Sequence, residues 1–113
     1  MHQADITVPI VDPCGLNPDT PVVVRAYIDP SEAFAVHRSA TRAHKGWDLT
    51  HIGTGLRVVD RFARRGDALL VAAIAVSTAK RESALAATDV ETAARNLDVA
   101  AIRAAAARYA RVK

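Results

Sequence analysis

An alternation of apolar and polar residues, interrupted by Gly-Thr-Gly at 53–55, constrains the fold of this chain more than any other feature. Trp47 and Leu49 alternate with polar residues before the interruption, and Leu56 and Val58 alternate after it. A period of two is typical of a strand with one buried face, and glycines supply the positive φ of a tight turn. The segment therefore predicts a β-hairpin whose four apolar side chains meet over the core.

The chain before the hairpin predicts further strands and an N-terminal arm. Residues 1–21 hold four of the five prolines, which predicts a proline-rich extended arm, although an alternation at residues 6–10 is compatible with a short edge strand. Residues 22–28 form a β-branched run that ends at an Asp-Pro pair, which favours a buried strand. Residues 33–37 fit either a second short strand or a single helical turn.

Two helices are predicted after the hairpin. Asp67 precedes an apolar run at 68–76 whose alanine and leucine content favours a deeply buried helix. Thr88 and Glu91 have the spacing of a capping box, in which each side chain bonds the backbone N–H of the other residue. A second helix from about 89 to 111 should follow, with an alanine-rich buried stripe and arginines on its opposite side.

Strands therefore come first and helices last, which is the order of an α+β domain. We expect residues 22–113 to form one such domain, with a small antiparallel sheet of three to four strands packed against the two C-terminal helices. Aromatic residues make up only 4% of the chain. The core should therefore consist of Ala, Val, Leu and Ile rather than large rings.

The formal net charge of +3 favours acidic partners, which include nucleic acid, an anionic membrane surface and acidic proteins. Cys14 is the only cysteine, so an intrachain disulfide and a four-cysteine zinc site are excluded. The sequence shows neither a secretory signal nor an apolar stretch long enough to span a bilayer. These features predict a cytoplasmic protein that does not act at a membrane.

Residues that could carry chemistry are sparse. His37, His44 and His51 recur every seven residues, but odd spacing alternates faces along strands and no carboxylate completes a ligand set, so no metal site is predicted. Cys14 lies in a proline-rich turn without a positioned histidine. Asp48 and His51 should point to opposite faces of one strand, which separates them as an acid–base pair. We therefore expect no catalytic residue, no enzyme activity and no cofactor.

Basic residues gather on both sides of the hairpin, which should fold the two groups back beside one another. One contiguous positive patch could then meet phosphates or an acidic protein, whereas a solvated surface with aspartates as counterions is the alternative. The scarcity of aromatic residues argues against stacking of single-stranded bases. The two groups are Arg38, Arg42, His44 and Lys45 before the hairpin and Arg57, Arg61, Arg64 and Arg65 after it.

The hairpin also resembles a pattern from known proteins. A Thr-His pair at 50–51, two spacer residues and Thr-Gly at 54–55, followed by a strand and an alanine-rich helix, is similar to small uncharacterised proteins encoded by phages and plasmids. Here the spacers are Ile52 and Gly53, and the match covers less than a third of the chain. The resemblance implies an accessory protein of a mobile element that acts by binding, as anti-CRISPR and other anti-defence proteins do.

The leading hypothesis is a non-enzymatic interaction protein that binds and modulates a host or self-encoded protein. It leaves open a homodimer formed through the alanine-rich helical face. The alternative is a nucleic-acid-binding regulator. The predicted partner-binding residues are Thr50, His51, Thr54, Arg57, Arg61, Arg64 and Arg65, and the alternative would use Arg38, Arg42, Lys45, Arg57, Arg61, Arg64 and Arg65.

Overall fold

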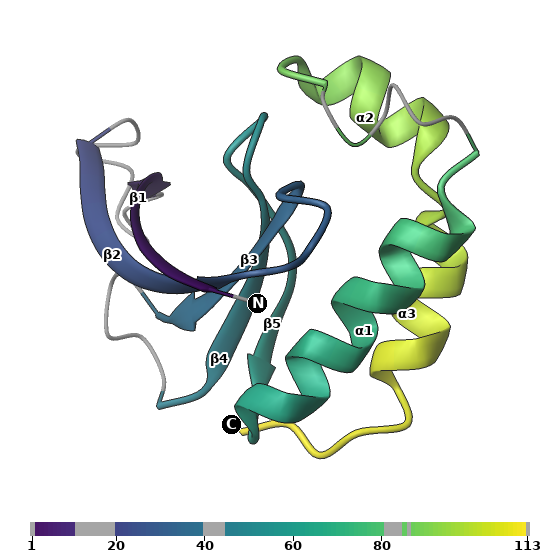
Figure 1. The fold of residues 1–113 in the computed structure, drawn as a ribbon. Helices are drawn as coiled ribbons and strands as arrows, with labels where there is room; N and C mark the ends of the chain where they lie inside the picture. The colour runs from purple at the N-terminus through teal and green to yellow at the C-terminus, as the bar shows by residue number, and fades with distance from the viewer. Residues whose placement is uncertain (1, 11–19, 40–44, 81–84, 86, 113) are drawn as a thin grey trace.

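The computed structural model describes residues 2–10, 20–39, 45–80, 85 and 87–112, which form one five-stranded antiparallel sheet and three helices. The strands follow one another across the sheet in chain order (Figure 1). The predicted α+β class is confirmed, with one strand and one helix more than expected. The elements are β1 (His2–Ile10), β2 (Thr20–Ile28), β3 (Phe34–Arg38), β4 (Trp47–His51), β5 (Leu56–Phe62), α1 (Arg65–Thr78), α2 (Val90–Asn96) and α3 (Val99–Ala106).

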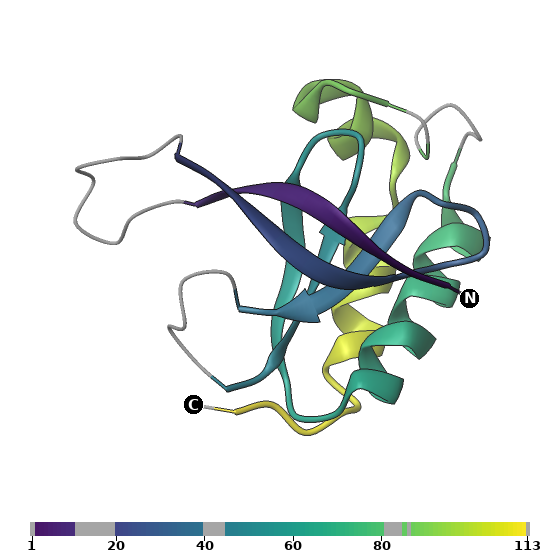
Figure 2. The same cartoon turned by 60° about the vertical axis from the view of Figure 1, so that its left-hand side comes forward.

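The N-terminal residues extend the sheet. β1 pairs with β2 along its whole length, from the His2↔Ile28 pair to the Ile10↔Thr20 pair. The edge strand that the alternation at residues 6–10 allowed is thus present and begins earlier than expected. Figure 2 shows the β1–β2 pair as a twisted ribbon that reaches away from the helices. Residues 11–19, which include Cys14, lie outside the described residues.

Two helices replace the single helix predicted from 89 to 111. α2 ends before Leu97, whose backbone is extended, and α3 begins after Asp98. The Asp98 carboxylate accepts the backbone N–H of Ala101 at 3.0 Å and so caps α3. An aspartate favours such a cap over a helix interior, where its side chain competes for backbone hydrogen bonds. The prediction of one long helix was therefore wrong.

The cap of α2 also differs from the predicted one by a residue. Asp89 is the N-cap, and its carboxylate accepts the Thr92 N–H at 3.2 Å and the Thr92 hydroxyl at 2.6 Å. Glu91 forms an ion pair with Arg95 one turn further along the helix. The capping box predicted between Thr88 and Glu91 was therefore wrong, because a carboxylate one residue later takes the position.

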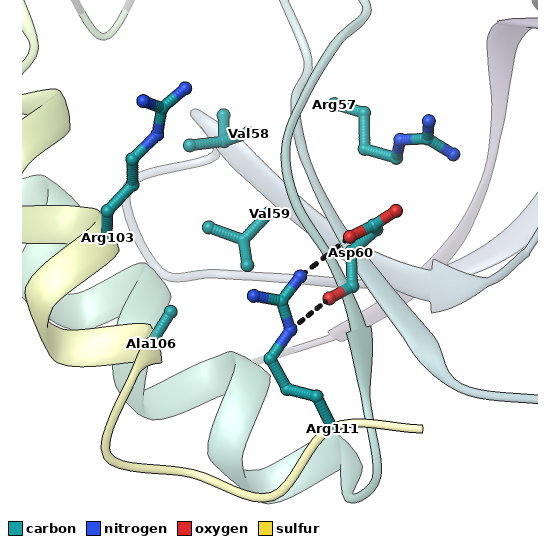
Figure 3. A pocket seen from close by; sticks show the side chains of 7 residues that line it. All are labelled: Arg57, Val58, Val59, Asp60, Arg103, Ala106 and Arg111. Carbon is teal, nitrogen blue, oxygen red and sulfur yellow. Dashed lines mark hydrogen bonds and ion pairs between the residues drawn. The ribbon is translucent and has the colours of Figure 1, made fainter. Parts of the chain in front are cut away.

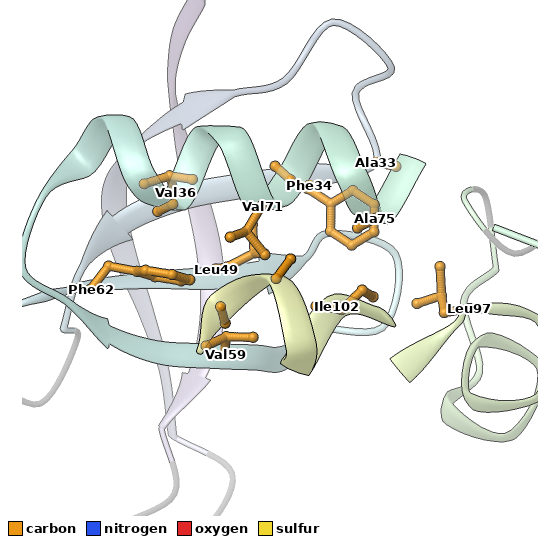
Figure 4. Packing of buried hydrophobic residues seen from close by; sticks show 14 of the residues in the cluster. Ala33, Phe34, Val36, Leu49, Val59, Phe62, Val71, Ala75, Leu97 and Ile102 are labelled. Carbon is orange, nitrogen blue, oxygen red and sulfur yellow. The ribbon is translucent and has the colours of Figure 1, made fainter. Parts of the chain in front are cut away.

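The core lies between the sheet and helices α1 and α3, which cover one of its faces (Figures 1 and 4). Phe34 and Phe62 are its two largest fully buried side chains, so the expectation of a core without large rings was wrong. α1 meets the sheet with Ala68, Ala72 and Ala75, each at most 1% exposed. Small helix residues leave room for rings on the sheet, which keeps the interior close-packed.

α1 is less buried than its apolar sequence predicted. One side of the helix, with Ala68, Val71, Ala72 and Ala75, is buried, but Leu70 is 54% exposed. A helix in a two-layer domain has one outward side whatever its composition. None of the helices in the described part of the chain is long and apolar enough to cross a membrane.

β5 is irregular along its pairing with β4. Its seven residues pair with the five residues of β4 through two register shifts. Each shift adds one unpaired residue to β5, which is a β-bulge and changes the face that the next side chains occupy. Arg61, at the second shift, has a φ of 67°. Val59 is consequently buried in the core, whereas Val58, which the alternation predicted to lie there, is half-buried.

Candidate functional site

The β4–β5 hairpin carries most of the predicted site residues, and its two ends lie far apart. The hairpin tip, residues 51–55, lies near α2, whereas the opposite end lies near the start of α1 (Figure 1). A strand rises about 3.3 Å per residue, so the length of β4 separates the ends by roughly 15 Å. Thr50, His51 and Thr54 lie toward the tip, while Arg61, Arg64 and Arg65 lie at the opposite end.

His51 is fully buried at the hairpin tip and uses both ring nitrogens. Its Nε2 lies 3.1 Å from the carbonyl oxygen of Leu85, and its Nδ1 lies 2.9 Å from Thr54 Oγ1 and 3.3 Å from the Thr54 backbone nitrogen. A carbonyl only accepts, so Nε2 carries the proton and Nδ1 accepts from Thr54. The ring also meets Phe34 edge to face, with centroids 5.5 Å apart. His51 therefore has a structural role, and its side chain does not reach the surface.

The backbone between α1 and α2 packs closely on the hairpin tip. A Cβ atom on Gly53 would lie 2.1 Å from the carbonyl oxygen of Ala87, so a side chain here would force the backbone to shift. Gly55 has a φ of 69°, the left-handed conformation that glycine adopts without strain. Positive φ was predicted for both glycines and holds only for Gly55. The hairpin tip is thus packed against the backbone segment between α1 and α2.

On the other face of the sheet, Thr50 and His37 form a buried hydrogen-bonded pair, each 2% exposed. Thr50 Oγ1 lies 2.8 Å from His37 Nε2, and His37 Nδ1 lies 2.7 Å from the carbonyl oxygen of Arg38. Nδ1 therefore donates, and the Thr50 hydroxyl donates to Nε2. A hydroxyl, a histidine and an orienting acceptor are the parts of an activated nucleophile. Burial of both side chains closes this pair to substrates.

Asp48 is the cross-strand neighbour of His37 and is 2% exposed. Its carboxylate accepts the backbone N–H of Arg61 at 3.3 Å and lies 3.8 Å from Nη1 of Arg57. Asp48 and His51 occupy opposite faces of β4, as the alternation predicted. Asp48 thus supports the second bulge of β5 and anchors Arg57, whose own side chain is 53% exposed.

The end of the hairpin opposite the tip aligns residues from four segments. Strand register pairs Arg38 with Trp47 and Trp47 with Phe62, and an isolated bridge pairs Phe62 with Arg111 of the C-terminal segment. Side chains directly opposite one another across antiparallel strands are close enough to interact. Arginines from β3 and from the C-terminal segment therefore flank a row of two buried or half-buried aromatic rings.

Two arginines stack on the two half-buried aromatic rings at this end. The guanidinium carbon of Arg38 lies 4.3 Å from the Trp47 ring centroid, and that of Arg65 lies 4.2 Å from the Tyr27 ring centroid. The two rings meet edge to face at 6.1 Å, and Arg65 donates to the Tyr27 hydroxyl at 2.6 Å. Such cation–π contacts hold the guanidinium groups in fixed positions at the surface.

The structure brings together only part of the predicted basic patch. Arg57 lies opposite Thr50, in the part of β5 nearer the tip. Arg42 and His44 lie outside the described residues. The remaining members are exposed and come from the end of β3, the start of β4, the end of β5 and the start of α1. We call this set the basic end: Arg38, Lys45, Arg61, Arg64 and Arg65.

Sequence reasoning did not include Trp47 or Tyr27 in the site. Trp47 alternates with Leu49, so it was assigned to the core alone. Tyr27 lies two strands away, and only the order of β2, β3 and β4 in the sheet places the two rings together. No local pattern carries that information, because contacts across the sheet depend on register.

The described residues contain no group of three or more His, Cys, Asp or Glu side chains placed to hold a metal ion. Comparison with models of known protein families gave no match, and neither did searches of curated proteins and of solved structures.

Proposed function

We propose that the chain is a non-enzymatic interaction protein that binds an acidic surface of a partner protein through the basic end. The observation that carries this proposal is the stack of Arg38 on Trp47 and of Arg65 on Tyr27, with the two rings in contact. Trp, Tyr and Arg are the residues enriched at binding hot spots. Because the arginines are already ordered by the rings, less side-chain entropy is lost when a partner binds.

A protein partner fits this surface better than a single-stranded nucleic acid. Arg38 and Arg65 cover faces of the two rings on which bases would otherwise stack. Binding of phosphates by the five residues of the basic end is the alternative, and it would not require stacking. A carboxylate surface is favoured because a guanidinium group can form paired hydrogen bonds with a carboxylate.

The resemblance of residues 50–55 to phage and plasmid proteins supports a setting for this activity. The chain would be an accessory factor of a mobile element that binds and modulates a host or self-encoded macromolecule, as anti-CRISPR-like proteins do. In this proposal the tip residues that carry the resemblance shape the hairpin, and the basic end makes the contact. Thr50 and His51 contribute through their buried hydrogen bonds.

The test is capture of partners from nuclease-treated host lysate by three forms of the purified chain. The unmodified chain and an Arg95→Glu control, which reverses an exposed charge on α2, should retain the same proteins. An Arg38→Glu, Arg65→Glu double variant should lose them. Equal capture by the double variant, or no capture by any form, would overturn the proposal.

Filter binding of duplex DNA and RNA across a salt titration tests the alternative. Phosphate contacts make affinity fall steeply as salt rises, with a slope set by the number of neutralised phosphates. Tight, salt-sensitive binding that the double variant abolishes would favour the nucleic-acid-binding regulator. Absence of binding at low salt would remove it.

A further inference from the structure

β5 is an edge strand whose outer side is open over part of its length. In the sheet order β1-β2-β3-β4-β5, it has a neighbouring strand only on the β4 side. Within the described residues, no backbone hydrogen bond beyond the sheet itself involves Arg57, Val58 or Val59. An edge strand presents unpaired N–H and C=O groups that can pair with another chain.

The C-terminal segment shows that this edge accepts an antiparallel strand. Arg111 bridges to Phe62, the Ala63 N–H donates to the Ala110 carbonyl at 3.0 Å, and the Val112 N–H donates to the Arg61 carbonyl at 2.8 Å. These bonds cover only the final part of β5 and the residue after it. Among the described residues, the same edge is therefore occupied at one end and open at the other.

Arg111 marks the boundary between the two parts of the edge. Its Nε donates to the backbone carbonyl of Asp60 at 2.9 Å, and its Nη2 lies 2.7 Å from the Asp60 carboxylate (Figure 3). The side chain thus satisfies a backbone acceptor that a strand would otherwise use. Beyond this point, toward the hairpin tip, no residue that the structure describes covers the backbone of residues 57–59 in this way.

A pocket of about 360 Å³ lies beside the open part of the edge, between β5 and α3. Val58 and Val59 point from β5 toward α3, where Ala106 completes an apolar floor (Figure 3). Arg103 rises from α3 at the rim and forms no ion pair with the described residues. Pockets of a few hundred cubic ångströms are within the range that binds small ligands and short peptide segments.

We propose that the open edge of β5 binds an extended acidic peptide, which adds a strand along residues 57–59. Backbone pairing would supply affinity, and alternate side chains of the peptide would supply specificity. Apolar side chains would contact the floor formed by Val58, Val59 and Ala106. An acidic side chain would pair with Arg103, the cation at the rim whose charge no described carboxylate balances. This site is separate from the basic end.

The probe is the acetylated, amidated peptide (Val-Glu)₄, which alternates apolar and acidic side chains. Fluorescence anisotropy should detect its binding to the unmodified chain, and Arg103→Glu should weaken that binding about tenfold through charge repulsion at the rim. Arg108→Glu is the matched control, because Arg108 is an exposed arginine just after α3 that does not line the pocket. It should change the affinity less than about twofold.

Two control peptides separate strand pairing from simple charge attraction. The peptide (Val-Lys)₄ should not bind, since it brings like charge to Arg103. A version with proline at its two central valine positions keeps the acidic charge but removes backbone donors, so it should also fail to bind. Equal binding of either control, or of (Val-Glu)₄ to the Arg103→Glu variant, would overturn the proposal.

Amide hydrogen exchange locates the bound peptide. Saturation with (Val-Glu)₄ should slow exchange within residues 57–59 of β5, the open part of the edge. Slowed exchange only elsewhere, for example along β1 at the other edge, would also overturn it. The Arg38→Glu, Arg65→Glu double variant should bind the peptide as the unmodified chain does, so failure at this edge and failure at the basic end remain distinguishable.

Discussion

The hairpin tip and the basic end lie at opposite ends of the β4–β5 hairpin, and they differ in what surrounds them. At the tip, His51 is fully buried, and the backbone at Ala87 lies so close that Gly53 has no room for a side chain. At the basic end, Arg38 and Arg65 lie exposed on half-buried rings. One end of the hairpin is therefore packed within the fold, and the other presents exposed arginines.

The residues of the Thr-His and Thr-Gly motif have structural roles within the hairpin. The Thr-His and Thr-Gly pairs at 50–55 are explained by internal hydrogen bonds and by close backbone packing. Arg38 and Arg65 also make contacts within the chain, with the Trp47 and Tyr27 rings, but their side chains remain exposed. Substitutions at the tip should therefore lower stability, whereas substitutions at the basic end should lower binding.

The largest loss of stability is expected for His51→Phe. Phenylalanine keeps the ring beside Phe34 but leaves the Leu85 carbonyl and the Thr54 donors without their buried partner. We expect the free energy of unfolding to fall by about 3 kcal/mol, measured by urea denaturation. Thr54→Val, which spares the bond to Leu85, should cost about 1 kcal/mol. If His51→Phe were as stable as the unmodified chain, packing alone would hold the tip.

Gly53→Ala should cost about 2 kcal/mol, because the new Cβ would lie 2.1 Å from a backbone carbonyl that must move. Gly66→Ala is the matched control. A Cβ there meets nothing within 4 Å, and Gly66 lies inside α1, where alanine is the better helix former. It should leave stability unchanged or raise it by up to about 1 kcal/mol. A loss at Gly66 as large as that at Gly53 would show that the Ala87 contact is not the cause.

Local patterns in the sequence predicted the α+β class, the hairpin and α1, because alternation and helix propensity act over a few residues. They gave wrong predictions where neighbouring residues compete for the same position. Asp89 caps α2 in place of Thr88, and Asp98 caps a separate helix where one continuous helix was predicted. Two bulges shift β5 so that Val59, rather than Val58, enters the core.

Part of the arrangement of the site could be predicted, because the pairing of the two hairpin strands is a local feature. That the hairpin would fold the segments before and after it back beside one another followed from strand pairing, and the register does pair Trp47 at the start of β4 with Phe62 at the end of β5. That Tyr27 lies beside Trp47 required the order of three strands. Such contacts depend on how strands that are distant in the sequence pair with one another. Local patterns in a single sequence do not reveal this pairing.

Asp89→Ala tests whether α2 helps to hold the backbone that covers the tip. Loss of the bonds to Thr92 at this cap should cost about 1 kcal/mol. Thr88→Ala should cost much less, because Thr88 is exposed and is not the cap. Amide exchange of His51–Gly55 should accelerate in Asp89→Ala if the cover loosens. Equal losses of stability in the two variants would show that Thr88 contributes to the cap as much as Asp89 does, as the predicted capping box requires.

The smallest effect on stability, and the one that separates the two ends most sharply, is expected for Arg65→Ala. The side chain is exposed, and its contacts with the Tyr27 ring and hydroxyl are screened by solvent, so unfolding should change by less than about 1 kcal/mol. Partner capture should nevertheless fall by about tenfold, since hot-spot arginines contribute more to binding than to folding.

Arg65→Lys keeps the charge but lacks the planar guanidinium, so it should recover only part of the capture. Full recovery by lysine would show that charge alone matters at this position, and a stability loss matching that of His51→Phe would show that the basic end, like the tip, belongs to the fold.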